Sequence, residues 1–145
     1  MTDRKKKQSQ TEVEFKEKYL RALADYQNLL KRVEQEKQRI EQDLSFRFLR
    51  RFLDIYDDVL RAEVFVTDPG LKMIKNKMKR FLQDFGVEEV DLEGKKFDPD
   101  LAEVVDVVEC KDEQENNTIS KVYRNAYKLS DKVLQVGKVQ VKKKS

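Results

Sequence analysis

Hydrophobic residues in the first third of the chain recur with the seven-residue period of a coiled coil. Between Phe15 and Asp43, positions separated by alternating steps of four and three residues are mostly apolar, and charged residues flank them. A narrow stripe kept over more than three heptads is typical of two helices that wrap around each other. We expect the following residues of this stripe to lie between two copies of the chain: Tyr19, Tyr26, Leu29, Val33 and Ile40.

A single amphipathic helix docked on a globular core is the alternative, but such a helix usually has a wider apolar face. Two positions of the stripe hold Glu36 and Asp43, where an apolar side chain would pack best. The paired helix should therefore be weak at these positions and should melt before the rest of the molecule.

The start of this helix is predicted from the segment Thr11-Glu12-Val13-Glu14, which has the spacing of a capping box. Residues 1–12 are then a disordered N-terminus. Neither Gly nor Pro occurs between residues 12 and 68. We therefore expect one helix of about 50 residues, roughly 75 Å long.

Beyond Leu44 the apolar positions cover more than one helix face, so this segment needs several packing partners. The segment Thr67-Asp68-Pro69 predicts a second helix, with Asp68 as its N-cap and Gly86 just after its end. Two copies of both helices would form a four-helix bundle at a dimer interface. The residues expected in this interface are Phe48, Phe52, Ile55, Ile74, Met78 and Phe81.

After Gly86 the apolar residues alternate with a period near two, which predicts four or five short strands separated by turns. The fold class is therefore α+β: a long coiled-coil helix, a short second helix and a small all-β domain. The predicted regions are residues 13–85 for dimerisation, residues 86–142 for the β domain and residues 143–145 for a basic tail.

Composition narrows the range of functions. Of 145 residues 41% are charged, yet 31 basic residues nearly balance 28 acidic ones, so no nucleic-acid partner is expected. The chain has no His and one Cys, Cys110, which leaves no disulfide framework, zinc cluster or catalytic base in view. The apolar runs are too short to span a membrane. We therefore expect a cytoplasmic protein that is not an enzyme and uses no metal or cofactor.

Several segments, taken in order, resemble the GrpE family. They are Ala24–Arg32 in the long helix, Leu53–Val59 at its end, Phe85–Glu88 at the junction with the strands, Phe97–Pro99, and Tyr127–Leu134. The resemblance covers residues 15–142 almost without gaps. Each segment alone is a weak motif, but their order and spacing are specific.

This resemblance implies a homodimer whose β domain, called the wing, acts on a chaperone. GrpE proteins are nucleotide exchange factors: they bind the ATPase domain of a DnaK-type chaperone and accelerate ADP release, and the long helix could sense temperature. Matched residue by residue, the implied chaperone contacts are Phe97, Pro99, Tyr123, Lys132 and Val141 in the wing, and Arg39, Arg61, Val64 and Phe65 in the helices.

Each of these positions also has a plainer interpretation. Phe97, Tyr123 and Val141 could fill the wing core, and Lys132 and the arginines could be solvated charges. A coiled-coil scaffold or tether without exchange activity would explain the helix equally well, but it does not account for the β domain.

The chain departs from the family pattern at several points. Ala102 stands where His is usual, Ala126 replaces a Gly, and Leu30 replaces a basic residue. The family stretch Arg-Val-Leu-Arg-Pro-Ala reads Lys132-Val133-Leu134-Gln135-Val136-Gly137 here. Lys132 keeps the charge of Arg but not its two-pronged donor geometry. These differences indicate a divergent member with a matching chaperone.

Overall fold

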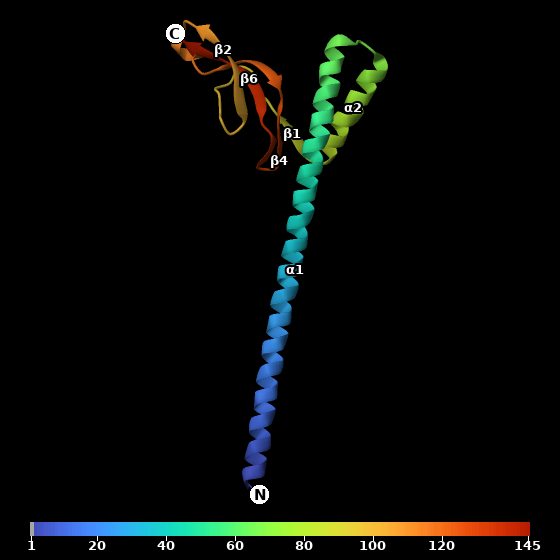
Figure 1. Ribbon diagram of the computed structural model, residues 1–145, viewed down its shortest axis with the longest axis vertical. Helices are drawn as coiled ribbons and strands as arrows, with labels where there is room; N and C mark the ends of the chain where they lie inside the picture. Colours follow the sequence, from blue (N-terminus) through green and yellow to red (C-terminus); the bar gives the residue numbers. More distant parts are fainter. Residues whose placement is uncertain (1) are drawn as a thin grey trace. The chain divides into compact units, whose positions relative to one another are not determined.

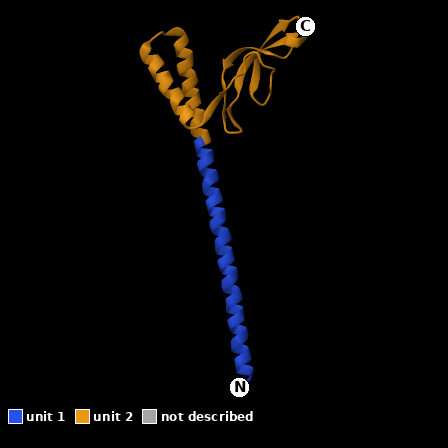
Figure 2. Cartoon of the chain, turned by 180° about the vertical axis from the view of Figure 1, so that it is seen from behind, with its two compact units in different colours: residues 1–45 blue, residues 46–145 orange. Residues whose placement is uncertain are grey.

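The computed structural model describes residues 2–145, which divide into two compact units, residues up to 45 and residues 46–145 (Figure 2). Two helices are followed by a wing of six strands and one 3₁₀ turn, so the predicted α+β class is confirmed (Figure 1). The elements are α1 (Thr2–Phe65), α2 (Pro69–Asp84), β1 (Val87–Val90), β2 (Ala102–Cys110), η1 (Glu113–Glu115), β3 (Ile119–Arg124), β4 (Ala126–Leu129), β5 (Lys132–Gln135) and β6 (Gly137–Lys144).

Helix α1 begins at Thr2, so the predicted start near Thr11 is wrong, and residues 2–12 are helical rather than disordered. The Thr11 hydroxyl donates to the carbonyl oxygen of Lys7 at 2.8 Å, the back-bonding geometry of a Thr inside a helix. Asp3 lies in the first turn, where its charge favours the helix dipole. With no Gly or Pro before Phe65, nothing local stops the helix.

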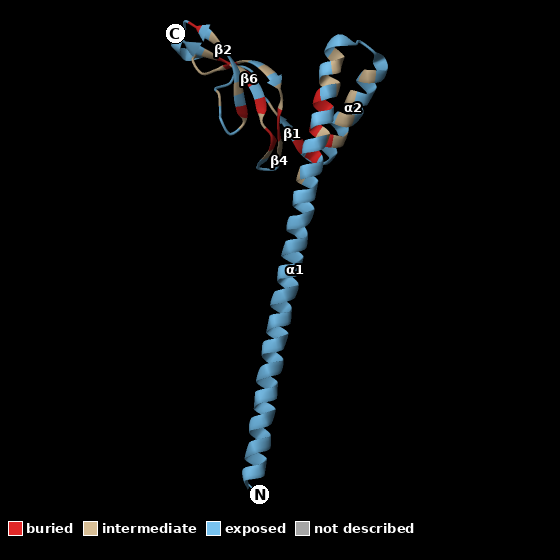
Figure 3. Ribbon diagram, in the orientation of Figure 1, coloured by how far each residue is buried: buried red, intermediate tan, exposed pale blue. Residues whose placement is uncertain are grey.

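The predicted coiled-coil stripe is uncovered in the single chain. Every described residue up to Ser45 is exposed (Figure 3). Tyr19 is 65% exposed and Val33 is 56% exposed, which is high for large apolar side chains. The stripe is thus free to pair with a second copy, and pairing stays a prediction.

Helix α2 has the predicted ends. The Asp68 side chain accepts a hydrogen bond from the Gly70 amide at 2.8 Å, and Pro69 occupies the first helical position. Gly86 has a φ of +82°, the left-handed conformation that terminates a helix at low steric cost. The helix packs back along α1, where the rings of Phe52 and Phe81 lie 4.6 Å apart between centroids.

The wing holds two three-stranded sheets, ordered β1-β4-β5 and β2-β6-β3. Strand β6 pairs parallel with β2 and antiparallel with β3. Strand β4 was missed in the sequence because it is only four residues long and joins β5 through a tight turn at Ser130, whose φ is +54°. The apolar residues at 133–141 belong to two strands, β5 and β6.

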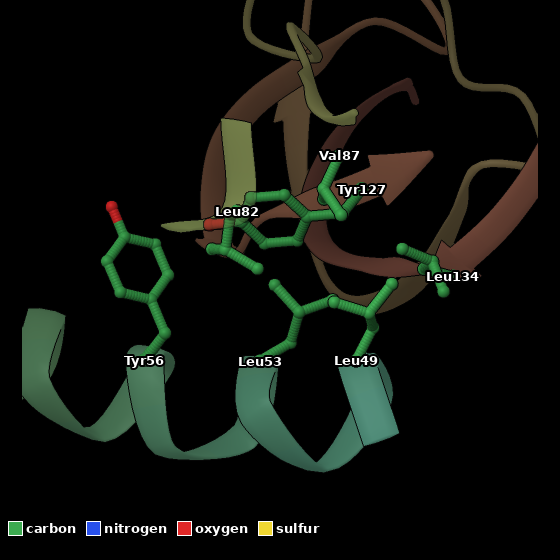
Figure 4. Packing of buried hydrophobic residues seen from close by; sticks show 7 residues of the cluster. All are labelled: Leu49, Leu53, Tyr56, Leu82, Val87, Tyr127 and Leu134. Atoms are coloured by element: carbon green, nitrogen blue, oxygen red, sulfur yellow. The ribbon is translucent and has the colours of Figure 1, made fainter. Parts of the chain in front are cut away.

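Two clusters of buried residues stabilise the second unit. One joins α1 and α2 to the wing, with Leu49, Leu53 and Tyr56 of α1 facing strands β1, β4 and β5 (Figure 4). The other lies inside the wing. The first cluster is completed by Leu82, Val87, Tyr127 and Leu134, and the second contains Leu92, Ala102, Ile119, Ala126, Val139 and Val141.

Gly137 sits where the wing core has no room for a side chain. A Cβ there would lie 2.6 Å from Leu92 Cδ1, 2.9 Å from the Arg124 carbonyl oxygen and 3.5 Å from Ala126 Cβ. Ala126 is itself fully buried. The family pattern has Gly at the position of Ala126 and Ala at the position of Gly137. The two departures from the family pattern are therefore neighbours in space.

Candidate functional site

A cleft of about 530 Å³ lies between the last turns of α1 and the strand β3 in the second unit. We call it the helix–wing cleft. Its α1 wall is formed by Asp54, Asp57, Asp58, Leu60, Arg61 and Val64, and its wing wall by Val122, Tyr123, Arg124, Asn125 and Lys138.

Three of the residues matched to chaperone contacts meet in this cleft. Arg61 and Val64 come from adjacent turns of α1, and Tyr123 comes from β3. Val64 is 80% exposed, and its neighbour Phe65 is 87% exposed. Arg61 pairs with Asp58 at 2.6 Å, but both side chains are largely in solvent, so the pair adds little stability and leaves the cation available.

Tyr123 is held in place although its ring is exposed. Its hydroxyl donates to Asp106 of β2 at 3.2 Å, and the Gln140 side-chain amide of β6 donates to the same carboxylate at 2.6 Å. The hydrogen bonds from Gln140 and from the Val107 amide hold the pKa of Asp106 below its usual value. Burial of the hydroxyl, with the bond to Asp106, raises the pKa of Tyr123. The network spans all three strands of the sheet and fixes the ring.

The floor of the cleft contains a buried carboxylate with a neutral partner. Asp57 is 7% exposed, and its Oδ2 accepts from Gln135 Nε2 at 2.8 Å. The same Gln135 nitrogen donates to the Asn125 carbonyl oxygen at 3.0 Å. Burial raises the pKa of Asp57, while the Gln135 hydrogen bond and the nearby Arg124 charge oppose that rise. In the family stretch that this segment resembles, Arg stands at the position of Gln135, so the partner of Asp57 in this chain is uncharged.

Strand β5 is attached to α1 at two points, which together we call the β5 clamp. Arg50 Nε donates to the Leu134 carbonyl oxygen at 3.0 Å, and Asp57, two turns further along α1, binds Gln135. The clamp lies beside the cluster of Leu49, Leu53 and Tyr56. Polar bonds thus set the register of the wing on the helix, and apolar contacts hold it there.

The remaining matched residues lie away from this cleft. Phe97 is partly buried against the wing core. Pro99 is exposed in a turn where Asp98 Oδ1 accepts from the Asp100 amide at 2.9 Å. Lys132 is exposed at the start of β5. In the first unit, Arg39 is exposed and pairs with Glu36 at 2.6 Å.

The predicted contact at Val141 is wrong. Its side chain is 0% exposed and belongs to the wing core. Strand β6 is the middle strand of its sheet, and Gly137, Val139 and Val141 all point to the buried face. A partner cannot reach this side chain in the folded wing, so the plainer interpretation applies to Val141.

Asp57 and Gln135 were missed as paired residues in the sequence. Asp57 lies inside the segment Leu53–Val59, and Gln135 lies in the stretch where the chain departs from the family. The only available signal was that one departure replaces a cation by an amide. Which carboxylate that cation would meet depends on how the wing packs on α1, and this packing is not visible in sequence.

Residues 2–145 contain no group of His, Cys, Asp or Glu side chains that could hold a metal ion. Cys110 is buried, and its thiol donates weakly to the Asp112 carbonyl oxygen at 3.5 Å. No helix within the same residues is long and apolar enough to cross a membrane.

Comparison with known proteins gives a consistent result over nearly the whole chain. The family model GrpE matches residues 2–143. The protein named Protein GrpE from Methanosphaera stadtmanae is 33% identical over 135 residues, which cover 90% of this chain and 78% of that protein. Proteins of the same name from Thermus thermophilus and Fructilactobacillus sanfranciscensis are 33% and 30% identical, over 88% and 85% of this chain and 73% of each relative.

Proposed function

The chain belongs to the GrpE family, the nucleotide exchange co-chaperones of DnaK-type chaperones, and we propose that two of its surfaces perform this exchange. They are the helix–wing cleft and the exposed wing residues Pro99 and Lys132. The observation that carries the proposal is that Arg61, Val64 and Tyr123, far apart in sequence, line one cleft. The alternative of a scaffold without exchange activity gains no support from the three relatives.

In this proposal the cleft binds one part of the chaperone ATPase domain. Val64 and Phe65 offer exposed apolar surface, Arg61 offers a cation, and Tyr123 offers a ring whose hydroxyl is already engaged within the sheet. A pre-oriented aromatic residue loses little entropy on binding and makes a good anchor.

Two exposed wing residues outside the cleft, Pro99 and Lys132, would contact a second part of the same domain. Pro99 stands in a turn fixed by hydrogen bonds, in which the amides of Leu101 and Ala102 both donate to the Asp98 carbonyl oxygen at 3.1 Å. Lys132 adds an exposed cation on β5. Both positions are accessible, unlike Val141.

Exchange requires that the factor bind the open nucleotide cleft better than the closed one, because only differential affinity shifts an equilibrium. Coupling between two ligands is reciprocal, so restored nucleotide must weaken binding of the factor. A wing fixed on α1 by the β5 clamp is rigid enough to favour one spacing between the two parts of the ATPase domain.

We also propose that two copies pair through the α1 stripe and through a four-helix bundle. Phe48, Ile55 and Ile74 are 56%, 58% and 51% exposed in the single chain. Phe52, Met78 and Phe81 are partly buried within the chain's own α1–α2 hairpin, so they would support the bundle from inside. The charged stripe positions Glu36 and Asp43 would let the long helix respond to heat. We place this binding activity in the cytoplasm and expect no catalysis by the chain itself.

The test is the rate of ADP release from the cognate chaperone, followed with a fluorescent ADP analogue. Val64→Asp and Tyr123→Ala each remove one anchor, and loss of an anchor costs about 1 to 3 kcal/mol, or roughly tenfold or more in stimulated release. Val105→Asp is the matched control, because Val105 is 49% exposed on β2 and does not line the cleft. Normal stimulation by both cleft variants would disprove the cleft assignment.

A further inference from the structure

The face of α2 that points away from its apolar face is a groove of about 410 Å³ with cationic walls. Its lining residues follow helical spacing along one side of α2: Pro69, Lys72, Met73, Asn76, Lys77 and Arg80. We call this surface the α2 basic groove. It shares no residue with the helix–wing cleft.

The charge of this helix has one sign over most of its length. From Pro69 to Gln83 every charged residue of α2 is Lys or Arg, and the only acidic residue is Asp84 at its end. Like charges three or four residues apart destabilise a helix, and α2 carries such pairs at Lys72 and Lys75 and at Lys77 and Arg80. Helix α1 instead mixes both signs along its surface. Helix stability alone therefore does not account for the composition of α2.

One lysine of α2 forms an ion pair within residues 2–145. Lys75, on the side next to α1, pairs with Glu63 at 2.7 Å. The groove cations Lys72, Lys77 and Arg80 are exposed and make no ion pair with any of residues 2–145. The charge of Lys75 is thus neutralised within the chain, and the three groove cations stay available to a partner.

An apolar side chain lies among these cations. Met73 is 60% exposed in the middle of the groove, and Pro69 forms one end. An adaptable thioether on an open surface suits contact with an apolar side chain of a partner. A helix that binds a membrane surface usually carries Trp, Phe or Leu beside its cations, and single-stranded nucleic acid stacks on aromatic side chains. The lining of the groove contains none of these residues.

We propose that the α2 basic groove binds an acidic polypeptide segment with an apolar side chain between its carboxylates. Glutamate or aspartate of the segment pairs with Lys72, Lys77 and Arg80, and the apolar side chain packs on Met73. The interaction is a second partner site of the co-chaperone, beyond nucleotide exchange at the helix–wing cleft.

The test measures fluorescence anisotropy of a short glutamate-rich peptide with a central leucine, added to the full-length protein. Replacing Lys72, Lys77 and Arg80 together by Glu should weaken binding about tenfold or more, since three exposed ion pairs contribute modestly each and reversal adds repulsion. The charge-matched control is Lys5→Glu, Lys6→Glu and Lys7→Glu, on the exposed start of α1, which should bind the peptide as the parent does. Raised salt should weaken binding by the parent.

A second variant tests the apolar contact. Met73→Ser should bind the leucine peptide several-fold more weakly and should not change binding of a peptide with serine in place of leucine. Stimulated ADP release and the helical signal should equal those of the parent in all these variants, which separates this site from the exchange site. Equal peptide binding by the reversed variant and the parent would overturn the proposal. Binding of oligothymidylate or of phosphatidylglycerol vesicles through the same cations, without peptide binding, would also overturn it.

Discussion

The two compact units of the chain reach stability in different ways. All described residues up to 45 are exposed, including the apolar side chains of the predicted coiled-coil stripe. Residues 46–145 bury two apolar clusters and a polar clamp within one chain. A lone helix cannot cover its own stripe, so under the proposed pairing the stability of the first unit would depend on protein concentration. The second unit depends on the fit of its own core.

This difference separates two kinds of sensitivity. Substitutions in the stripe should change the affinity between copies and leave the wing intact. Substitutions in the wing core should change unfolding at every concentration. The proposed function uses both units, so both kinds of variant should lower activity. The unfolding transition that shifts, that of the helix or that of the wing, would then distinguish them.

The largest effect is expected from Val141→Asp. The carboxylate would enter a core position that is 0% exposed, and burying an unpaired charge costs about 4 kcal/mol or more. The strand signal in circular dichroism should be lost at a lower urea concentration, while α1 stays helical. Val105→Asp, on an exposed β2 position, is the control and should unfold like the parent. A wing of normal stability in the Val141 variant would mean that this side chain is accessible after all.

The second effect concerns the first unit. Replacing Glu36 and Asp43 by Leu puts apolar side chains in the stripe, and partial burial of these leucines should stabilise the paired helix by about 3 kcal/mol. The helical melting transition should rise and should depend on protein concentration. Glu34→Leu with Glu41→Leu, two positions before the stripe residues and also seven residues apart, should leave it unchanged. Equal shifts in both double variants would contradict pairing through this stripe.

Structural features that depend on a few adjacent residues could be predicted from the sequence. Asp68 and Gly86 ended α2 as expected because capping depends on a few adjacent residues. The start of α1 was wrong because a Thr with a Glu three residues later also fits a helix interior, where Thr11 bonds back to Lys7. Strand β4 was missed because four residues carry too little periodicity to be recognised.

In the candidate site, individual residues could also be predicted from the sequence, whereas their arrangement in space could not. Residue-by-residue matching to the family supplied Arg61, Val64 and Tyr123, but only packing of the wing on α1 places them in one cleft. The alternation of apolar and polar residues along β6 placed Val141 on one face of a strand, but it did not show which face is buried. The pair of Asp57 and Gln135 joins elements far apart in the chain and had no local signature.

The third effect tests how tightly the second unit is packed. In Gly137→Ala the new methyl would lie 2.6 Å from Leu92 Cδ1, and overpacking of this kind costs about 2 kcal/mol. Adding Ala126→Gly should recover about half of that loss, because it removes the methyl 3.5 Å away and gives Leu92 room to move. Urea denaturation of the two single variants and the double variant measures this coupling. Additive losses would show that the two positions are independent.

The smallest effect concerns the charge at the β5 clamp. Burial raises the pKa of Asp57, so the folded state binds its proton more tightly than the unfolded state. Ionisation of Asp57 therefore lowers stability as pH rises from the ordinary value of 3.8 through the raised folded value. Gln135→Arg places a cation beside the carboxylate and should reverse this sign, adding about 1 kcal/mol near neutral pH. Gln135→Leu removes the hydrogen bond without adding charge and should lower the free energy of unfolding by about as much.

Urea denaturation at acidic and neutral pH checks both variants. The Arg variant should gain only above the ordinary pKa of Asp57, because a protonated carboxyl offers no charge to pair. A gain that is equal at both pH values would show that the introduced arginine acts through packing rather than through its charge.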